Sequence, residues 1–216
     1  MSFYQQLQSA TSTSQQLMMS APVIDACRQG TITGDMYIAF LTQAYHHVSY
    51  TVPLLMAASG RLPRHQAWVR EAIEEYIDAE YDHKASILHR IRACGGKTET
   101  LSQNAATQWI ELMAAYLYDQ IQRDNPMSIF GLIHVLEGIQ ANIAPDMVRQ
   151  IEAEQGLPVG TINGLQAQDP AEKTCQNVFA ARMDNISDSA DQTAIIHAAH
   201  VVYQLYGDML RSLTEH

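Results

Sequence analysis

Basic residues, cysteines and long apolar runs are all scarce in this sequence. Thirteen Lys and Arg stand against 23 Asp and Glu, a formal net charge of −10, which argues against nucleic acid or an anionic membrane surface as a partner. No apolar run reaches the roughly 18 residues that a membrane-spanning helix needs. The first residues have neither the basic start nor the apolar core of a secretory signal. We therefore expect a soluble protein.

The three cysteines, Cys27, Cys94 and Cys175, are far apart and form no Cys-x-x-Cys pair. Such a set is typical of reduced thiols in a cytoplasmic protein. The sequence also lacks a Gly-rich phosphate loop, an alternating strand pattern and an internal repeat. Its 47% hydrophobic content excludes general disorder, and its length predicts one domain spanning residues 1–216.

Helical periodicity runs through most of the chain and predicts an all-α architecture with about seven helices. We expect Pro53 to kink the second helix and Pro145 to bend or break the fifth just after it. Leu17, Leu112 and Val178 are among the predicted core positions. The predicted helices run from Ser2 to about Arg28, Thr33 to Gly60, Leu62 to Gly95, about Ser102 to Arg123, Asn125 past Pro145, Pro170 to about Asn185, and from the SDSAD segment to Leu213.

The third predicted helix directs an ionisable pair toward the interior. Its apolar stripe contains Tyr76, His83 and Ile87, and Glu80 falls inside that stripe, one turn from His83. An unpaired buried charge costs several kcal/mol. Glu80 therefore needs a metal ion, another cation or a proton of its own.

Other predicted helices repeat this pattern. Helical spacing places His47 inward and His46 outward, Glu137 inward with His134 beside it, and His200 inward on the last helix. Carboxylates and imidazoles on facing helices are what a non-haem iron or manganese site uses. Satisfied core histidines and structural ion pairs would give the same pattern, so both interpretations stay open at this point.

Three segments resemble a known superfamily: FLTQAYHHVSYTVPLL, YIDAEYDHKASILHRIRACG and FGLIHVLEG. They are similar to the haem-oxygenase-like, seven-helix fold of the TenA, PqqC and CADD-like families, and most similar to its iron-containing redox enzymes. The resemblance implies a homodimer that acts on a small molecule and binds Fe(II), one ion or two. It implies Glu80, His83 and Glu137 as metal ligands.

The ligand set that the resemblance implies is incomplete. The iron-containing enzymes place a His-x-x-x-Asp-x-x-His pattern on the penultimate helix, where this chain has Leu165, Asp169 and Glu172. Asp169 and Glu172 also form a capping box that begins this helix. His200 or His47 would then complete the metal site or act as acid–base groups, with Tyr76 and Tyr203 lining the pocket.

Two other branches of the superfamily imply different chemistry. The Gln-Asp-Tyr of TenA corresponds to Gln43, Ala44 and Tyr45 here, and no cysteine stands where its nucleophile should be, which argues against thiaminase activity. Similarity to PqqC would imply a cofactor-free pocket for a polar aromatic compound. Haem is not expected, because the acidic chain offers few cations for its propionates.

Three functional hypotheses follow. The first is a non-haem iron oxidoreductase built on Glu80, His83 and Glu137. The second is a metal-free enzyme, similar to TenA or PqqC, that acts on a small heteroaromatic molecule. The third is a degenerate binding protein that keeps the fold without catalysis and pairs its glutamates with histidines.

Overall fold

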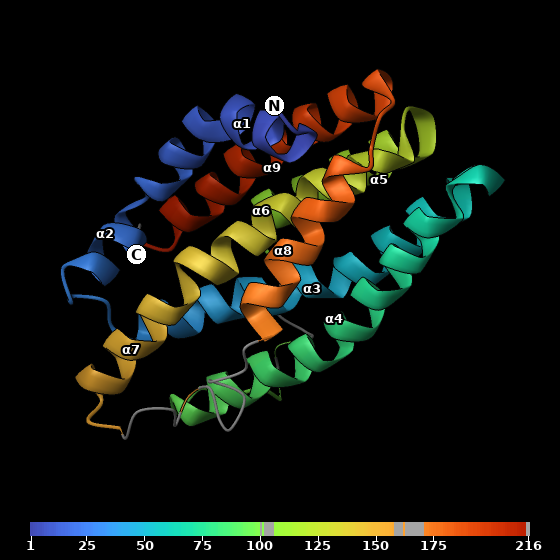
Figure 1. Cartoon of the computed structure of the whole chain (residues 1–216). Coiled ribbons are helices and arrows are strands. Elements are labelled where there is room, and N and C mark those ends of the chain that lie inside the picture. Colours follow the sequence, from blue (N-terminus) through green and yellow to red (C-terminus); the bar gives the residue numbers. More distant parts are fainter. Residues whose placement is uncertain (100, 102–105, 158–161, 163–170, 215–216) are drawn as a thin grey trace.

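The computed structural model describes residues 1–99, 101, 106–157, 162 and 171–214, and these contain helices and no β-strand (Figure 1). Two short 3₁₀-helices, η1 (Arg64–Gln66) and η3 (Pro126–Ser128), precede α4 and α6. The α-helices of the described part are α1 (Phe3–Met19), α2 (Pro22–Arg28), α3 (Gly34–Arg61), α4 (Ala67–Ala93), α5 (Gln108–Arg123), α6 (Ile129–Asn142), α7 (Ala144–Glu154), α8 (Ala171–Asp184) and α9 (Ser189–Ser212).

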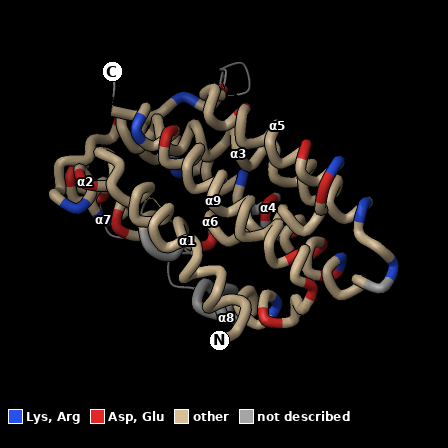
Figure 2. The backbone as a smooth tube through the Cα atoms, turned by 90° about the horizontal axis from the view of Figure 1, so that it is seen from above, with Lys and Arg blue, Asp and Glu red and all other residues tan. Residues whose placement is uncertain are grey.

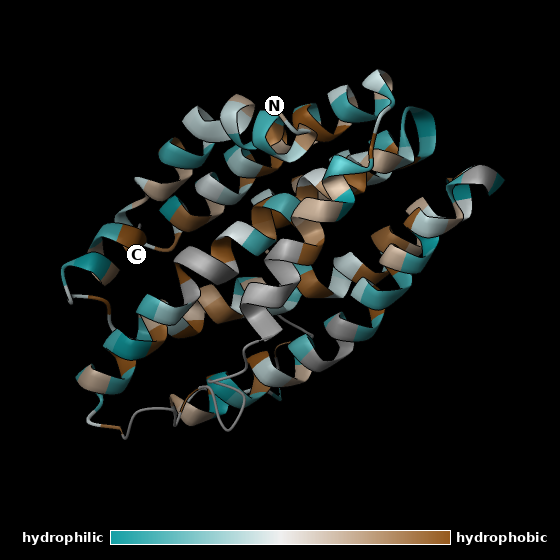
Figure 3. Ribbon diagram, viewed as in Figure 1, coloured by the Kyte–Doolittle hydropathy of each residue, from teal (hydrophilic) through white to brown (hydrophobic). Residues whose placement is uncertain are grey.

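Helix α9 lies at the centre of the packing. It packs against α1, α5 and α6, while α3 packs against α4 and α5. Helices α1 and α9, which are far apart in the sequence, lie side by side (Figure 1). Each helix carries both hydrophobic and hydrophilic positions (Figure 3), as amphipathic helices around a shared core do. Among the described helices, none combines the length and apolar composition that a bilayer crossing requires.

Helix ends follow local sequence signals. The side chain of Thr33 accepts a hydrogen bond from Met36 N at 3.3 Å, which confirms Thr33 as the N-cap of α3. Helix α4 ends just before Gly95, whose φ of 78° is a conformation that glycine adopts readily. The carboxylate of Asp188 accepts hydrogen bonds from Ala190 N and Asp191 N at the start of α9.

Proline divides the chain into more helices than the predicted seven. The predicted helix from Ser2 to Arg28 is two helices, because α1 ends at Met19 and Pro22 begins α2. The break near Pro145 lies before this residue rather than after it, since α6 ends at Asn142 and α7 begins at Ala144. Proline has no N–H to donate and fits the first helical turn best.

In three neighbouring pairs of predicted core positions, Leu17–Met18, Leu112–Met113 and Val178–Phe179, the first member is exposed and the second is confirmed as buried. Leu17, Leu112 and Val178 are 58%, 50% and 40% exposed. In each case the next residue along the chain is buried: Met18, Met113 and Phe179. Adjacent helical residues lie about 100° apart, so two neighbouring apolar residues compete for one inward position. Packing against other helices decides which of them is buried.

Helix α1 carries no Lys, Arg, Asp or Glu and is drawn tan in the charge view (Figure 2). Its side chains contact the bundle through apolar groups and hydroxyls. Its backbone also donates from Tyr4 N to Asp184 Oδ1 at 2.8 Å and accepts at Leu17 O from Arg211 at 3.4 Å. Phe3, Leu7, Thr11 and Met18 are its buried residues. This uncharged helix therefore covers one side of the core without ion pairs of its own.

Ser128 and Asp188 each stand at the start of a helix, and replacing them by alanine should change the free energy of unfolding in different ways. The hydroxyl of Ser128 is fully buried and has no hydrogen-bond partner, so Ser128→Ala should leave the free energy of unfolding unchanged or raise it. Asp188→Ala removes the cap of α9 and should lower that free energy by about 1 kcal/mol. Urea unfolding of both variants checks this, and a clear loss in Ser128→Ala would contradict it.

Candidate functional site

Glu80 and His83 lie together on α4. Glu80 Oε2 is 3.7 Å from His83 Nδ1, and the two side chains are 14% and 27% exposed. Glu80 Oε2 itself is buried and has no hydrogen-bond partner. A carboxylate oxygen in this position attracts a proton or a cation. Because the pair is not fully enclosed, solvent can still reach part of it.

His47 on α3 adds a second imidazole near this pair. Its Nδ1 is buried without a partner, and its ring meets that of Tyr206 edge-on at 5.8 Å between centroids. Burial lowers the pKa of His47 to about 3, and the neighbouring His83 acts in the same direction. His47 is therefore neutral near pH 7 and keeps an unshared electron pair.

His46 is buried as well, and its predicted outward position is wrong. Its Nε2 has no hydrogen-bond partner, and burial lowers its pKa. The reason is that α3 packs against α4 on one side and α5 on another. A helix covered on two sides buries residues outside the single stripe that periodicity defines.

Glu137 and His134 on α6 face α1 and α9. His134 Nε2 lies 3.3 Å from Thr11 Oγ1 and 3.4 Å from the Tyr203 hydroxyl. Glu137 is half-buried. After burial itself, the charge of Glu137 is the next cause that raises the pKa of Tyr4, which places this carboxylate near the first turn of α1.

His200 and Tyr76, two further predicted site residues, have distinct surroundings. His200 Nδ1 forms a hydrogen bond of 2.8 Å with the hydroxyl of Ser14 on α1. Tyr76 on α4 is half-buried and packs against the core. The contact with Ser14 engages one of the two ring nitrogens of His200.

The predicted metal ligands are only partly brought together. Glu80 and His83 form a pair on α4. Glu137 and His200 instead lie near α1, beside Tyr4 and Ser14. Within the described ranges, no three His, Cys, Asp or Glu side chains form a group that could hold a metal ion. Positions 165 and 169 and the side chain of Glu172 lie outside the described residues. The unpartnered oxygen of Glu80 beside His83 nonetheless suits a cation.

A polar cleft that periodicity did not predict lies at the start of α4 and α9. It has a volume of about 300 Å³, and Trp68, Asp188 and Asp191 are among its lining residues. Asp191 accepts hydrogen bonds from Gln66 Nε2 at 3.1 Å and Asn125 Nδ2 at 2.8 Å. Its lining residues come from three separate segments of the chain, around positions 66–68, 127 and 185–191, so helical spacing carried no signal for it.

Comparison with known families identifies one match. The model of a family described as iron-containing redox enzymes matches residues 38–162, more than half of the chain. The matched range includes Glu80, His83 and Glu137. No functionally curated protein matches the sequence.

Solved structures share the fold. A domain of unknown function with a heme oxygenase-like fold from Shewanella denitrificans has a TM-score of 0.79 at 16% identity, over 95% of this chain and 89% of that chain. A TenA homologue from Pseudomonas syringae has 0.75 at 11%, over 98% and 92%. The heme oxygenase from Leptospira interrogans has 0.75 at 13%, over 98% and 100%. These likenesses confirm the predicted haem-oxygenase-like, TenA-like fold.

Proposed function

Because the chain belongs to the family of iron-containing redox enzymes, we propose that it is an oxidoreductase that binds Fe(II) at Glu80 and His83 and acts on a small molecule. One observation carries this proposal. The buried oxygen of Glu80 has no hydrogen-bond partner and lies 3.7 Å from His83 Nδ1. Carboxylate oxygen and imidazole nitrogen are ligands that suit Fe(II), and a bound cation would remove the cost of the isolated charge.

The surrounding side chains support the pair in different ways. His47 is neutral near pH 7 and its Nδ1 has no hydrogen-bond partner. Because a pKa near 3 disfavours protonation, a further metal ligand is its better role. Tyr206 packs against His47 and holds its ring in place. Glu137 and His200 remain the predicted further ligands, and Tyr76 and Tyr203 the predicted lining of the pocket. When bound, iron would supply the activation of dioxygen.

Iron content tests this function directly. Elemental analysis of protein from iron-supplemented medium should find at least about one iron ion per chain. Glu80→Gln and His83→Gln should each lower the iron affinity at least tenfold, because each removes a proposed ligand. Glu74→Gln changes an exposed carboxylate on the same helix and should leave the iron content unchanged. Trace iron that neither ligand substitution alters would overturn the proposal.

The contact between Glu80 and His83 also favours a second function, that of a metal-free acid–base enzyme for a small heteroaromatic molecule. A carboxylate beside an imidazole orients the ring for proton transfer to a substrate, and this needs no metal. Iron-free protein would then be stabilised against heat by a pyrimidine from thiamin breakdown or by a quinoid compound. Glu80→Gln should abolish that stabilisation. Absence of any stabilisation would rule out this function for these compounds.

A further inference from the structure

The polar cleft at the start of α4 and α9 is separate from the pair of Glu80 and His83. Both helices begin at the same end of the bundle (Figure 1). Trp68 lines the cleft and lies more than three turns before Glu80 on α4, about 18 Å along the helix axis. The volume of the cleft, about 300 Å³, is that of the smaller pockets that hold small organic ligands. It therefore offers space for a ligand outside the proposed iron site.

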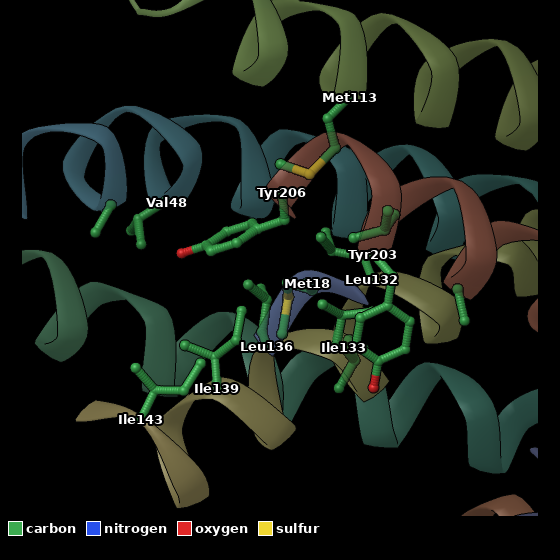
Figure 4. Packing of buried hydrophobic residues seen from close by; sticks show 14 of the residues in the cluster. Met18, Val48, Met113, Leu132, Ile133, Leu136, Ile139, Ile143, Tyr203 and Tyr206 are labelled. Atoms are coloured by element: carbon green, nitrogen blue, oxygen red, sulfur yellow. The ribbon is translucent and has the colours of Figure 1, made fainter. Parts of the chain in front are cut away.

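The apolar part of the cleft lining belongs to the packed core. Met127 and Ile186 line the cleft and are only 1% and 4% exposed. Elsewhere in this core, apolar side chains such as Leu132, Leu136 and Ile139 fill the space between the helices (Figure 4). The cleft therefore offers apolar contact to a short hydrocarbon chain.

The polar part of the lining brings negative charge without positive charge. Asp188 and Asp191 contribute two carboxylates, and the lining contains no Lys, Arg or His. Among the described residues, neither carboxylate takes part in an ion pair. The start of α9 offsets these charges only in part, because a helix N-terminus is equivalent to about half a positive charge. The charge of the cleft therefore favours a cationic ligand.

Asp191 fixes the orientation of the Gln66 amide in the cleft wall. Gln66 Nε2 donates to Asp191 Oδ2 at 3.1 Å, so the carbonyl oxygen Oε1 is the atom left to accept. Oε1 is buried and has no hydrogen-bond partner, which costs free energy until a donor reaches it. An ammonium group has three N–H donors. It can give one of them to Oε1 while its charge stays beside the carboxylates.

We propose that this cleft binds a small aliphatic amine in its ammonium form. The ammonium lies between the two carboxylates and the indole of Trp68, the aromatic group that attracts cations most strongly. The alkyl chain rests on Met127 and Ile186. An organic cation is favoured over a metal ion, because no three His, Cys, Asp or Glu side chains of the described residues form a group that could hold a metal.

NMR of the indole N–H groups tests the binding on iron-free protein. The chain has two tryptophans, and Trp109→Phe identifies the signal of Trp68. Butylammonium at pH 7 should shift the Trp68 signal to saturation and leave the Trp109 signal unchanged. Butan-1-ol has nearly the same shape without the charge, so it should bind at least about fivefold more weakly. Equal binding of both compounds, or no shift of Trp68, would overturn the proposal.

A charge-removing variant tests the role of the carboxylates. Asp188→Asn removes one charge and keeps the cap of α9, because asparagine caps a helix as well as aspartate does. It should weaken butylammonium binding about fivefold. Glu74→Gln removes the same charge from an exposed position outside the lining and should leave the affinity unchanged.

Two results would contradict the assignment of the ligand. One is an affinity for butylammonium that Asp188→Asn does not change. The other is tighter binding of Mg²⁺ than of butylammonium, which would identify a site for an inorganic cation. Because the protein contains no iron in these measurements, failure of the iron proposal would leave both results unaffected.

Discussion

Gly131→Ala should be among the most destabilising small substitutions in this protein, lowering the free energy of unfolding by about 3 kcal/mol. A Cβ at position 131 would lie 2.6 Å from Ala199 N, 2.7 Å from Ala198 Cβ and 2.7 Å from the carbonyl oxygen of Ile195. Two of these atoms are backbone atoms of α9, so no side-chain rotation relieves the contact. Helices α6 and α9 would have to move apart, which disturbs the centre of the core.

Gly138→Ala on the same helix is the matched control. There a Cβ would lie 3.8 Å from Gln15 Nε2 and 3.8 Å from the Tyr203 hydroxyl, which is ordinary van der Waals contact. Alanine also favours the helix over glycine by about 1 kcal/mol. Thermal and urea unfolding should therefore show a loss at position 131 and no loss, or a gain, at position 138. Equal behaviour of the two variants would contradict the close approach of α6 and α9.

Acid should destabilise the protein well before its carboxylates are protonated. Burial lowers the pKa of His134 to about 4 in the folded chain, against about 6.5 when unfolded. Between these values the unfolded state binds more protons, so stability falls as the pH falls. The full loss from His134 is about 3 kcal/mol and is complete near pH 4. His47 adds a loss of the same sign that continues to about pH 3.

Urea unfolding between pH 7 and pH 4 measures this slope. His134→Gln, which keeps a donor toward Thr11 and cannot be protonated in this range, should flatten it. His89→Gln changes an exposed histidine on α4 and should leave the slope unchanged. A stability that stays constant from pH 7 to pH 4 in the unmodified protein would show that His134 is not buried as a neutral ring.

The sequence predicts the helices well where a local signal marks their ends. Thr33 caps α3 as predicted, and Gly95 follows α4 as predicted. The breaks at Pro22 and Pro145 were missed or misplaced because the apolar stripe continues across them, and periodicity outweighed the proline signal. Proline in the first turn of a helix begins that helix, which is the rule that both positions follow.

The site was less predictable than the fold. Spacing correctly placed Glu80 beside His83, because both belong to one helix and their separation is fixed by its geometry. Contacts between helices depend on packing that spacing does not contain. His46 is buried on a helix, α3, that packs against both α4 and α5, and the hydrogen bond between Ser14 and His200 depends on the register of α1 along α9.

The absence of charge from α1 has a consequence for how firmly this helix is held in different solvents. Its buried residues are apolar side chains and the hydroxyl of Thr11, and added salt screens only interactions between charges. Salts such as sulfate strengthen the burial of apolar surface. The apolar packing of α1 over His134 should therefore hold in concentrated brine as well as in dilute buffer.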